Sequence, residues 1–182
     1  DAALPRDPAA ALKWLTYAAE LGNQFAQYRL GKLLLKGDDG IPKDVIAAIR
    51  WLTAAAKQEN GYAEYALALV YLTGEDAPKD SVKALSLLKR SAGWGNQFAQ
   101  YRLGKLLLQG EDAPKDVKAA IRWLTAAAEQ GNQYAQYALG KLYLLGKEVP
   151  KDRSSAIKWF QLAADQGNEY AQYFLEHMDD RL

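Results

Sequence analysis

The chain has 182 residues, of which 49% are hydrophobic, so it is long enough to bury a continuous core. Its 23 Lys and Arg residues nearly balance 22 Asp and Glu residues, and the whole-molecule charge therefore gives no reason to expect nucleic acid or an anionic membrane as partner. Because the chain has no cysteine, disulfides, thiolate catalysis and cysteine-ligated metals are excluded.

No apolar stretch approaches the ~20 residues that a membrane helix requires, so we expect no membrane contact. The first residues also lack the basic and apolar regions of a signal peptide. The compartment therefore stays unassigned, with the cytoplasm favoured, and the oligomeric state is unassigned as well.

A six-residue phrase, Asn-X-(Phe/Tyr)-Ala-(Gln/Glu)-Tyr, recurs along the chain at spacings of 37, 36, 36 and 36 residues. A fixed period of this length is typical of stacked helical repeats. We expect one domain over 1–182, divided into a half repeat and four full repeats followed by a C-terminal capping helix. The predicted bounds are 1–22 for the half repeat, 23–59, 60–95, 96–131 and 132–167 for the full repeats, and 168–182 for the cap.

The first part of each full repeat is predicted to be a helix that carries the tyrosine of the phrase, and we call it the Tyr helix. In the first copy, residues 23–36, Ala26, Leu30 and Leu33 form one apolar stripe at helical spacing. A glycine ends each copy, and a proline a few residues later prevents continuation. The other copies are expected over 60–73, 96–109 and 132–145.

The second part of each repeat is predicted to be a helix with tryptophan or leucine near its middle, and we call it the Trp helix. An aspartate in Pro-Lys-Asp is placed to cap its first turn, at positions 44, 80, 116 and 152. Glycine ends most copies, but Glu59 occupies that position in the first full repeat. Since Glu is costly at positive φ, we expect Asn60 and Gly61 to form that turn instead.

Glycines inside the Tyr helices predict close helix packing. Gly31, Gly104 and Gly140 each cost ~1 kcal/mol relative to Ala in a helix interior, so a neighbouring helix is expected to approach where no Cβ stands. Ala68 fits the same role in the second repeat, whereas Glu176 in the last one indicates a polar cap.

These phrases resemble the Sel-one-like repeat family, a branch of the tetratricopeptide-type solenoids with units of about 36 residues. The resemblance rests on Ala-Gln-Tyr-X-Leu-Gly at 26–31, 99–104 and 135–140, on Pro-Lys-Asp, and on Ala-Ala-Glu-Gln-Gly at 127–131. It implies an all-α fold in which antiparallel helix pairs stack into a right-handed superhelix that serves as an adaptor between proteins. The stretch 131–144 also resembles repeats appended to plasmid-mobilisation proteins of Gram-positive gut bacteria.

The sequence offers no catalytic, cofactor or metal site. His177 is the only histidine, and without a serine or cysteine partner we interpret it as a capping residue. The acidic pairs Asp38-Asp39, Glu75-Asp76 and Glu111-Asp112 lack the spacing of a calcium loop and are interpreted as solvated loop charge. We therefore expect that the chain is not an enzyme.

Helix phase points to a binding surface, since burial of Ala26, Leu30 and Leu33 turns Tyr28 and Lys32 the opposite way. In tetratricopeptide-like solenoids that side lines the concave groove. A basic, aromatic groove fits an acidic or amphipathic peptide segment, although the tyrosines alternatively serve only to pack adjacent helices. The repeated phase gives a ladder of tyrosines at 28, 65, 101, 137 and 173 with Lys32, Lys105 and Lys141 between them.

Trp94 stands apart because it occurs once, where the other repeats have Gln58, Gln130 and Gln166. A single tryptophan at a polar position is either a binding hot spot or a local packing residue. The partner-binding residues that we predict are Tyr28, Lys32, Tyr65, Trp94, Tyr101, Arg102, Lys105, Tyr137 and Lys141.

The leading interpretation is a scaffold that binds a protein segment in this groove. The alternative is an accessory module of a nucleic-acid-processing, mobilisation-type protein whose groove contacts single-stranded nucleic acid. An enzyme ranks last.

Overall fold

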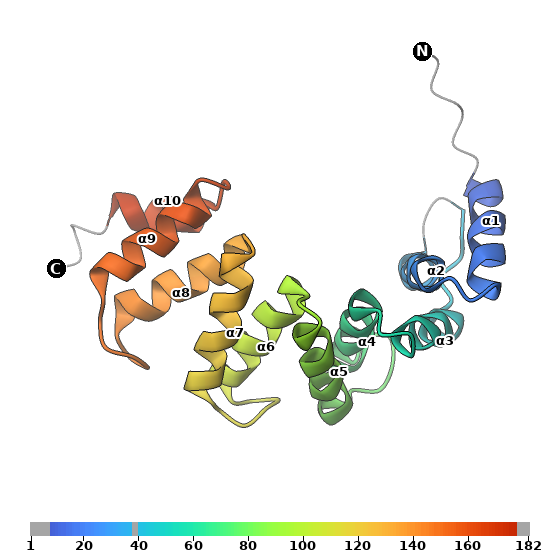
Figure 1. The fold of residues 1–182 in the computed structure, drawn as a ribbon, viewed down its shortest axis with the longest axis horizontal. Helices are drawn as coiled ribbons and strands as arrows, with labels where there is room; N and C mark the ends of the chain where they lie inside the picture. The colour runs from blue at the N-terminus through green and yellow to red at the C-terminus, as the bar shows by residue number, and fades with distance from the viewer. Residues whose placement is uncertain (1–7, 38–39, 178–182) are drawn as a thin grey trace, which may run out of the picture. The chain divides into compact units, whose positions relative to one another are not determined.

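The computed structural model describes residues 8–37 and 40–177, and within these ranges the secondary structure is helical, with no strand (Figure 1). The predicted all-α class built from paired helices is confirmed. Asp38, Asp39 and the outer ends of the predicted segments 1–22 and 168–182 lie outside the described residues. The helices are α1 (Pro8–Glu20), α2 (Gln24–Lys36), α3 (Val45–Ala56), α4 (Gly61–Thr73), α5 (Ser81–Gly93), α6 (Gln97–Gln109), α7 (Val117–Glu129), α8 (Gln133–Leu145), α9 (Arg153–Ala164) and α10 (Glu169–Glu176).

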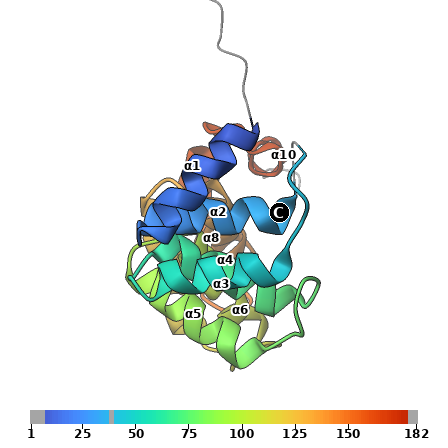
Figure 2. The same cartoon turned by 90° about the vertical axis from the view of Figure 1, so that its right-hand side faces the viewer.

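The chain divides into two compact units, Asp1–Ser91 and Ala92–Leu182, called unit 1 and unit 2. In unit 1, α2 packs against α1 and α3, and Figure 2 shows α2 and α3 running side by side. In unit 2, α6 packs against α7 and α8 against α9, while α7 also packs against α8 and α10 against α9. The described helices offer no segment of the length and apolar content that crossing a bilayer requires.

Both kinds of helix begin at a side-chain cap. The Asn23 side-chain oxygen accepts hydrogen bonds from the backbone N–H groups of Phe25 and Ala26, so the asparagine that opens each phrase is the N-cap of its Tyr helix. The predicted aspartate caps of the Trp helices are confirmed, for example at Asp44, which accepts from the N–H of Ala47 at 2.9 Å. The repeat period is therefore also a period of helix starts.

Glu59 corrects one expectation, since its φ is 64° and it occupies the left-handed region after all. Gly61 is instead the first residue of α4, so the predicted Asn60-Gly61 turn is wrong. The Asn60 N–H donates to the Ala55 carbonyl, the same closing bond that glycine-containing repeats form. Packing of the two helix ends fixes this turn, and Glu59 adopts the strained backbone that it demands.

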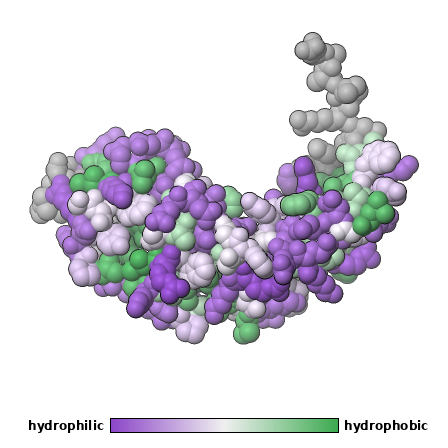
Figure 3. Space-filling view, in the orientation of Figure 1, coloured by the Kyte–Doolittle hydropathy of each residue, from purple (hydrophilic) through white to green (hydrophobic). Residues whose placement is uncertain are grey.

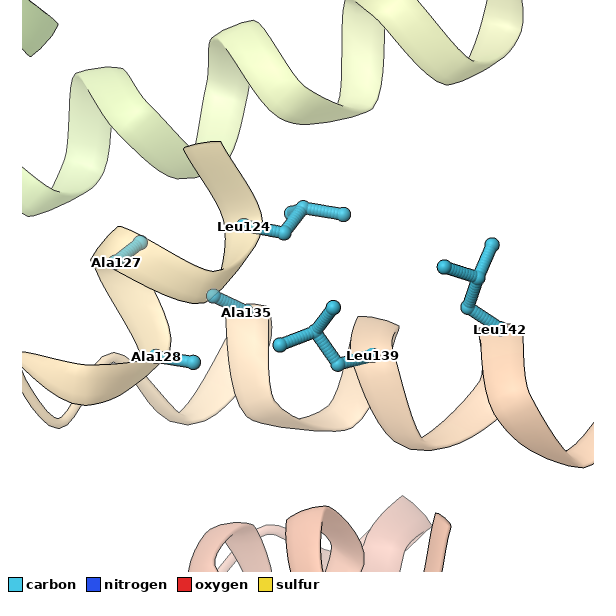
Figure 4. Packing of buried hydrophobic residues seen from close by; sticks show 6 residues of the cluster. All are labelled: Leu124, Ala127, Ala128, Ala135, Leu139 and Leu142. Carbon is cyan, nitrogen blue, oxygen red and sulfur yellow. The ribbon is translucent and has the colours of Figure 1, made fainter. Parts of the chain in front are cut away.

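The predicted close approach at the mid-helix glycines is confirmed. A Cβ placed on Gly140 would lie 2.6 Å from Cδ1 of Phe160, and one on Gly31 would lie 2.6 Å from Cγ of Leu52. Each of these Tyr helices therefore packs its glycine against a large side chain of the following Trp helix. Figure 4 shows the core beside one such contact, formed by Leu124, Ala127 and Ala128 of α7 with Ala135, Leu139 and Leu142 of α8.

Candidate functional site

Three of the tyrosines at the end of the repeated phrase lie half-buried on their Tyr helices, and each pairs with an aromatic ring of the next Tyr helix. In unit 1, the ring centroids of Tyr28 and Tyr62 are 5.9 Å apart. In unit 2, Tyr101 lies 6.0 Å from Tyr134, and Tyr137 lies 6.0 Å from Tyr170. Consecutive Tyr helices within a unit are thus joined by pairs of aromatic rings, which contact each other in a tilted arrangement.

A lysine one turn later lies over each of these three tyrosines. The Nζ of Lys32 is 5.7 Å from the ring centroid of Tyr28, and the corresponding distances for Lys105 over Tyr101 and Lys141 over Tyr137 are both 5.8 Å. These are cation–π distances, and the i, i+4 spacing on a helix produces them directly. Each unit has its own set of such residues, which we call the Tyr–Lys surface of that unit: Tyr28, Lys32 and Tyr62 in unit 1, and Tyr101, Lys105, Tyr134, Tyr137, Lys141 and Tyr170 in unit 2.

The lysines of the Tyr–Lys surface have no carboxylate partner among the described residues, and neither does Arg102 on α6. In the loops, by contrast, Lys43 pairs with Asp76 at 2.5 Å and Lys115 with Glu148 at 2.7 Å. Asp76 is therefore not simply a solvated charge, because it bridges to the preceding loop. The surface cations are left to interact with solvent or with a ligand.

Burial raises the pKa of the Tyr137 hydroxyl, and the neighbouring Tyr170 raises it further. The phenol therefore stays neutral at physiological pH. A neutral phenol both donates and accepts hydrogen bonds, which suits contact with a polar peptide backbone. On the face of unit 2 drawn in Figure 3, hydrophilic residues surround smaller hydrophobic areas.

The structure places the other predicted site residues as follows. Tyr65 lies half-buried on α4, where Leu69 occupies the position that carries lysine in three other repeats. Arg102 is half-buried on α6, next to Tyr101 in sequence. Trp94 lies in the turn after α5 with 55% of its surface exposed, and not on a Tyr helix.

Sequence reasoning missed the aromatic residue at the third position of the phrase. Tyr62 and Tyr134 are each 53% exposed and Tyr170 is 71% exposed, so they present more ring surface than the half-buried partners Tyr28, Tyr101 and Tyr137. The signal was available, because the third and sixth positions of the phrase are three residues apart and share a helix face.

A partly buried amide pair in the other repeats explains why Trp94 is singular. The Nε2 of Gln58 donates to Oε1 of Gln27 at 2.8 Å, and the Nε2 of Gln27 donates to the carbonyl of Ala19. The second repeat has Glu64 and Trp94 at these two glutamine positions, so the amide pair is lost there. The same bond joins Gln130 to Gln100 and Gln166 to Gln136.

Glu64 is instead held by Arg90. Its side chain is fully buried, and the Arg90 guanidinium lies 2.6 Å from its carboxylate. Burial raises the pKa of Glu64, while Arg90 lowers it and Glu59 raises it. A charged pair thus replaces the amide pair in this repeat, so no glutamine is needed at position 94 to form it.

The described residues contain no group of three or more His, Cys, Asp or Glu side chains placed to hold a metal ion. His177 caps α10, because its Nδ1 lies 2.8 Å from the Tyr173 carbonyl oxygen and its backbone N–H donates to the same atom. Its ring is stacked on Tyr173 with centroids 4.3 Å apart.

The sequence matches the family model of the Sel1 repeat over 2–23, 24–60, 61–93, 97–132 and 133–168. A comparison with curated proteins finds no match.

Two solved structures are each 35% identical to this chain. One is c5321, a protective antigen of uropathogenic Escherichia coli strains with an SLR fold, which aligns over 93% of this chain with a TM-score of 0.88. The other is a Sel1 repeat protein from Oxalobacter formigenes, which aligns over 96% with a TM-score of 0.86. This chain spans 36% and 50% of their lengths. Cysteine rich protein B of Helicobacter pylori, 23% identical over 72% of this chain and 95% of its own, shares the fold with a TM-score of 0.57.

Proposed function

This chain belongs to the Sel1 repeat family, whose members are generally protein-interaction scaffolds, and we propose that it binds an acidic or amphipathic segment of a protein partner through the Tyr–Lys surface. Tyr65 on α4 belongs to the contact area proposed for unit 1, and Arg102 on α6 to that proposed for unit 2. Trp94 is proposed as a separate hydrophobic anchor.

One observation carries the proposal: cations without an ion-pair partner among the described residues lie over aromatic pairs that the fold leaves partly exposed. Tyrosine supplies contact area at low entropic cost, and unpaired lysines attract carboxylates and steer their approach. A comparison of lysines within the chain also supports the proposal. The loop lysines Lys43 and Lys115 form ion pairs with carboxylates of neighbouring loops, whereas the lysines of the Tyr–Lys surface form none among the described residues.

Aromatic rings with basic neighbours also suit single-stranded nucleic acid, which is the competing interpretation. The two ligands differ in a measurable way. For nucleic acid, the logarithm of the affinity falls steeply and linearly with the logarithm of the salt concentration. A short acidic peptide that makes two or three ion pairs gives a shallower dependence of affinity on salt.

The test is fluorescence anisotropy of the full chain with three labelled probes: a deca-glutamate peptide, a deca-lysine peptide and a thymidine decanucleotide. We expect the glutamate peptide to bind, and the double variant Tyr101→Ala with Lys105→Ala to lose most of that binding. Tyr17→Ala with Lys118→Ala is the matched control, since both residues are exposed and lie on Trp helices. Thermal unfolding of each variant checks the fold.

Loss of glutamate binding in the first variant alone supports the proposal. Tighter binding of the thymidine probe with a steep salt slope would favour the nucleic-acid interpretation. Equal binding by both variants and the parent chain would overturn the assignment of this surface.

A further inference from the structure

In three repeats a lysine lies one helical turn after the tyrosine. In the last repeat His177 occupies the position of that lysine. Tyr137 and Lys141 on α8 correspond, 36 residues later, to Tyr173 and His177 at the end of α10. The His177 ring covers Tyr173 as the lysines of the preceding repeats cover their tyrosines, and its ring nitrogens can donate hydrogen bonds there.

Among the described residues, only one edge of the His177 ring has a hydrogen-bond partner. Its Nδ1 faces the Tyr173 carbonyl at 2.8 Å, which assigns the Nδ1 proton to that bond. The Nε2 is on the opposite edge of the ring. When a carboxylate lies beside an imidazole it favours the charged form, in which Nε2–H donates a charge-assisted hydrogen bond.

Lys105 and Lys141 lie on the Tyr helices α6 and α8, and His177 is the C-cap of the next Tyr helix, α10. Ring contacts join α6 to α8 through Tyr101 and Tyr134, and α8 to α10 through Tyr137 and Tyr170, in each case at 6.0 Å. Packed helices lie about 8–10 Å apart. A peptide in the polyproline II conformation rises about 3.1 Å per residue with three residues per turn, so residues three apart share a face and span about one step between helices, whereas a helical peptide needs about six residues for that step.

We propose that unit 2 binds a peptide in the polyproline II conformation with carboxylates at every third residue, which contact Lys105, Lys141 and His177 in turn. This inference rests on the proposed function and adds to it the conformation and spacing of the ligand, together with a third contact residue. Glu169 and Glu176 are also on α10, so the His177 contact is the weakest of the three.

The test compares two labelled ten-residue peptides of identical composition, four Glu and six Ser, with the full chain at low salt. In one peptide the four Glu residues follow one another at intervals of three positions, and in the other at intervals of two. We expect the first to bind about three- to fivefold more tightly, the effect of aligning one or two exposed ion pairs.

Two variants test the histidine itself, and a third is the control. His177→Lys should raise the affinity for the three-residue peptide by about threefold, and His177→Asn, which keeps a hydrogen-bond donor for the Tyr173 carbonyl, should lower it by about twofold. Lys118→Ala, an exposed lysine on α7, should change nothing. Thermal unfolding separates a loss of the cap from a loss of the contact.

Equal affinity of the two peptides overturns the three-residue spacing while the proposed function stands. An affinity unchanged by both His177 variants makes His177 a helix cap only. Failure of both peptides and of the deca-glutamate probe to bind the parent chain removes the proposed function and this inference with it.

Discussion

Arg90 and Glu64 form the ion pair that distinguishes the second repeat, with the guanidinium 2.6 Å from a carboxylate that is fully buried. The same guanidinium lies 3.5 Å from the Ala56 carbonyl, which corresponds to the Ala19 carbonyl bound by Gln27 in the first repeat. One arginine therefore serves the two acceptors that a pair of glutamine amides serves elsewhere, because a guanidinium carries five N–H donors in a rigid plane.

Arg90→Ala is expected to destabilise the chain by about 2 kcal/mol, since it leaves a buried carboxylate without its counter-charge. Glu64→Gln in the same background should recover most of the loss, because an uncharged amide costs less to bury. Urea unfolding of the two single variants and the double variant measures the coupling. Additive effects would show that the two side chains do not act as a pair.

The pH dependence of Arg90→Ala follows from the direction of the Glu64 shift. Burial raises the pKa of Glu64, and removal of Arg90 takes away the influence that lowers it. A carboxyl whose pKa is higher in the folded than in the unfolded state binds its proton more tightly when folded, so the variant should regain stability as pH falls toward that raised pKa. Urea midpoints between about pH 7 and pH 5 measure this, and a flat difference from the parent chain would contradict it.

Gly140→Ala is expected to cost about 1–3 kcal/mol, because the new methyl group would stand 2.6 Å from the Phe160 ring. Gly93→Ala is the matched control, since its Cβ meets nothing within 4 Å and its backbone is helical. That change should be neutral or stabilising by up to ~0.5 kcal/mol. Equal unfolding midpoints for the two variants would show that Phe160 moves aside freely.

Glu59→Gly is expected to stabilise unit 1 by about 1 kcal/mol, because glycine adopts the φ of 64° without a Cβ penalty. Glu59→Ala keeps the penalty and serves as the control. Since Glu59 raises the pKa of Glu64, both variants should lower that pKa. Only the glycine variant also relieves the backbone strain at residue 59. Differential scanning calorimetry ranks the three proteins, and an alanine variant as stable as the glycine variant would exclude backbone strain as the cause.

Ser155→Ala is expected to raise the pKa of Asp152, the N-cap of α9. The Ser155 hydroxyl donates to the Asp152 carboxylate at 2.6 Å and is the largest cause of its lowered pKa, ahead of the Ser155 backbone N–H. A lowered pKa means that the stabilisation is present at neutral pH and is lost as pH falls below the ordinary Asp value of about 3.9. The variant should therefore lose this capping contribution at a higher pH.

An NMR titration of the Asp152 carboxyl follows the change directly. Ser154→Ala is the control, because Ser154 acts on Asp152 only through its backbone N–H. A similar rise in both variants would assign the shift to the helix terminus and not to the hydroxyl.

The sequence by itself determined the repeat period, the alternation of the two kinds of helix, the aspartate caps and the glycines where helices approach. These features depend on short-range physics, namely the helical spacing of apolar residues, the hydrogen bonds of a cap within three residues, and the missing Cβ of glycine. For the same reason Tyr28 and Lys32 were predicted to share a face, as residues four positions apart always do on a helix.

The tertiary structure alone decided which side chains meet across helices. Tyr62 and Tyr134 join the surface because the next Tyr helix brings them against the preceding tyrosine, and Gln58 meets Gln27 from 31 positions away. Glu59 adopts positive φ because the packing of the helices on either side fixes its turn more strongly than its own preference does. Contacts of this kind depend on how helices far apart in sequence are packed, which no local pattern of residues encodes.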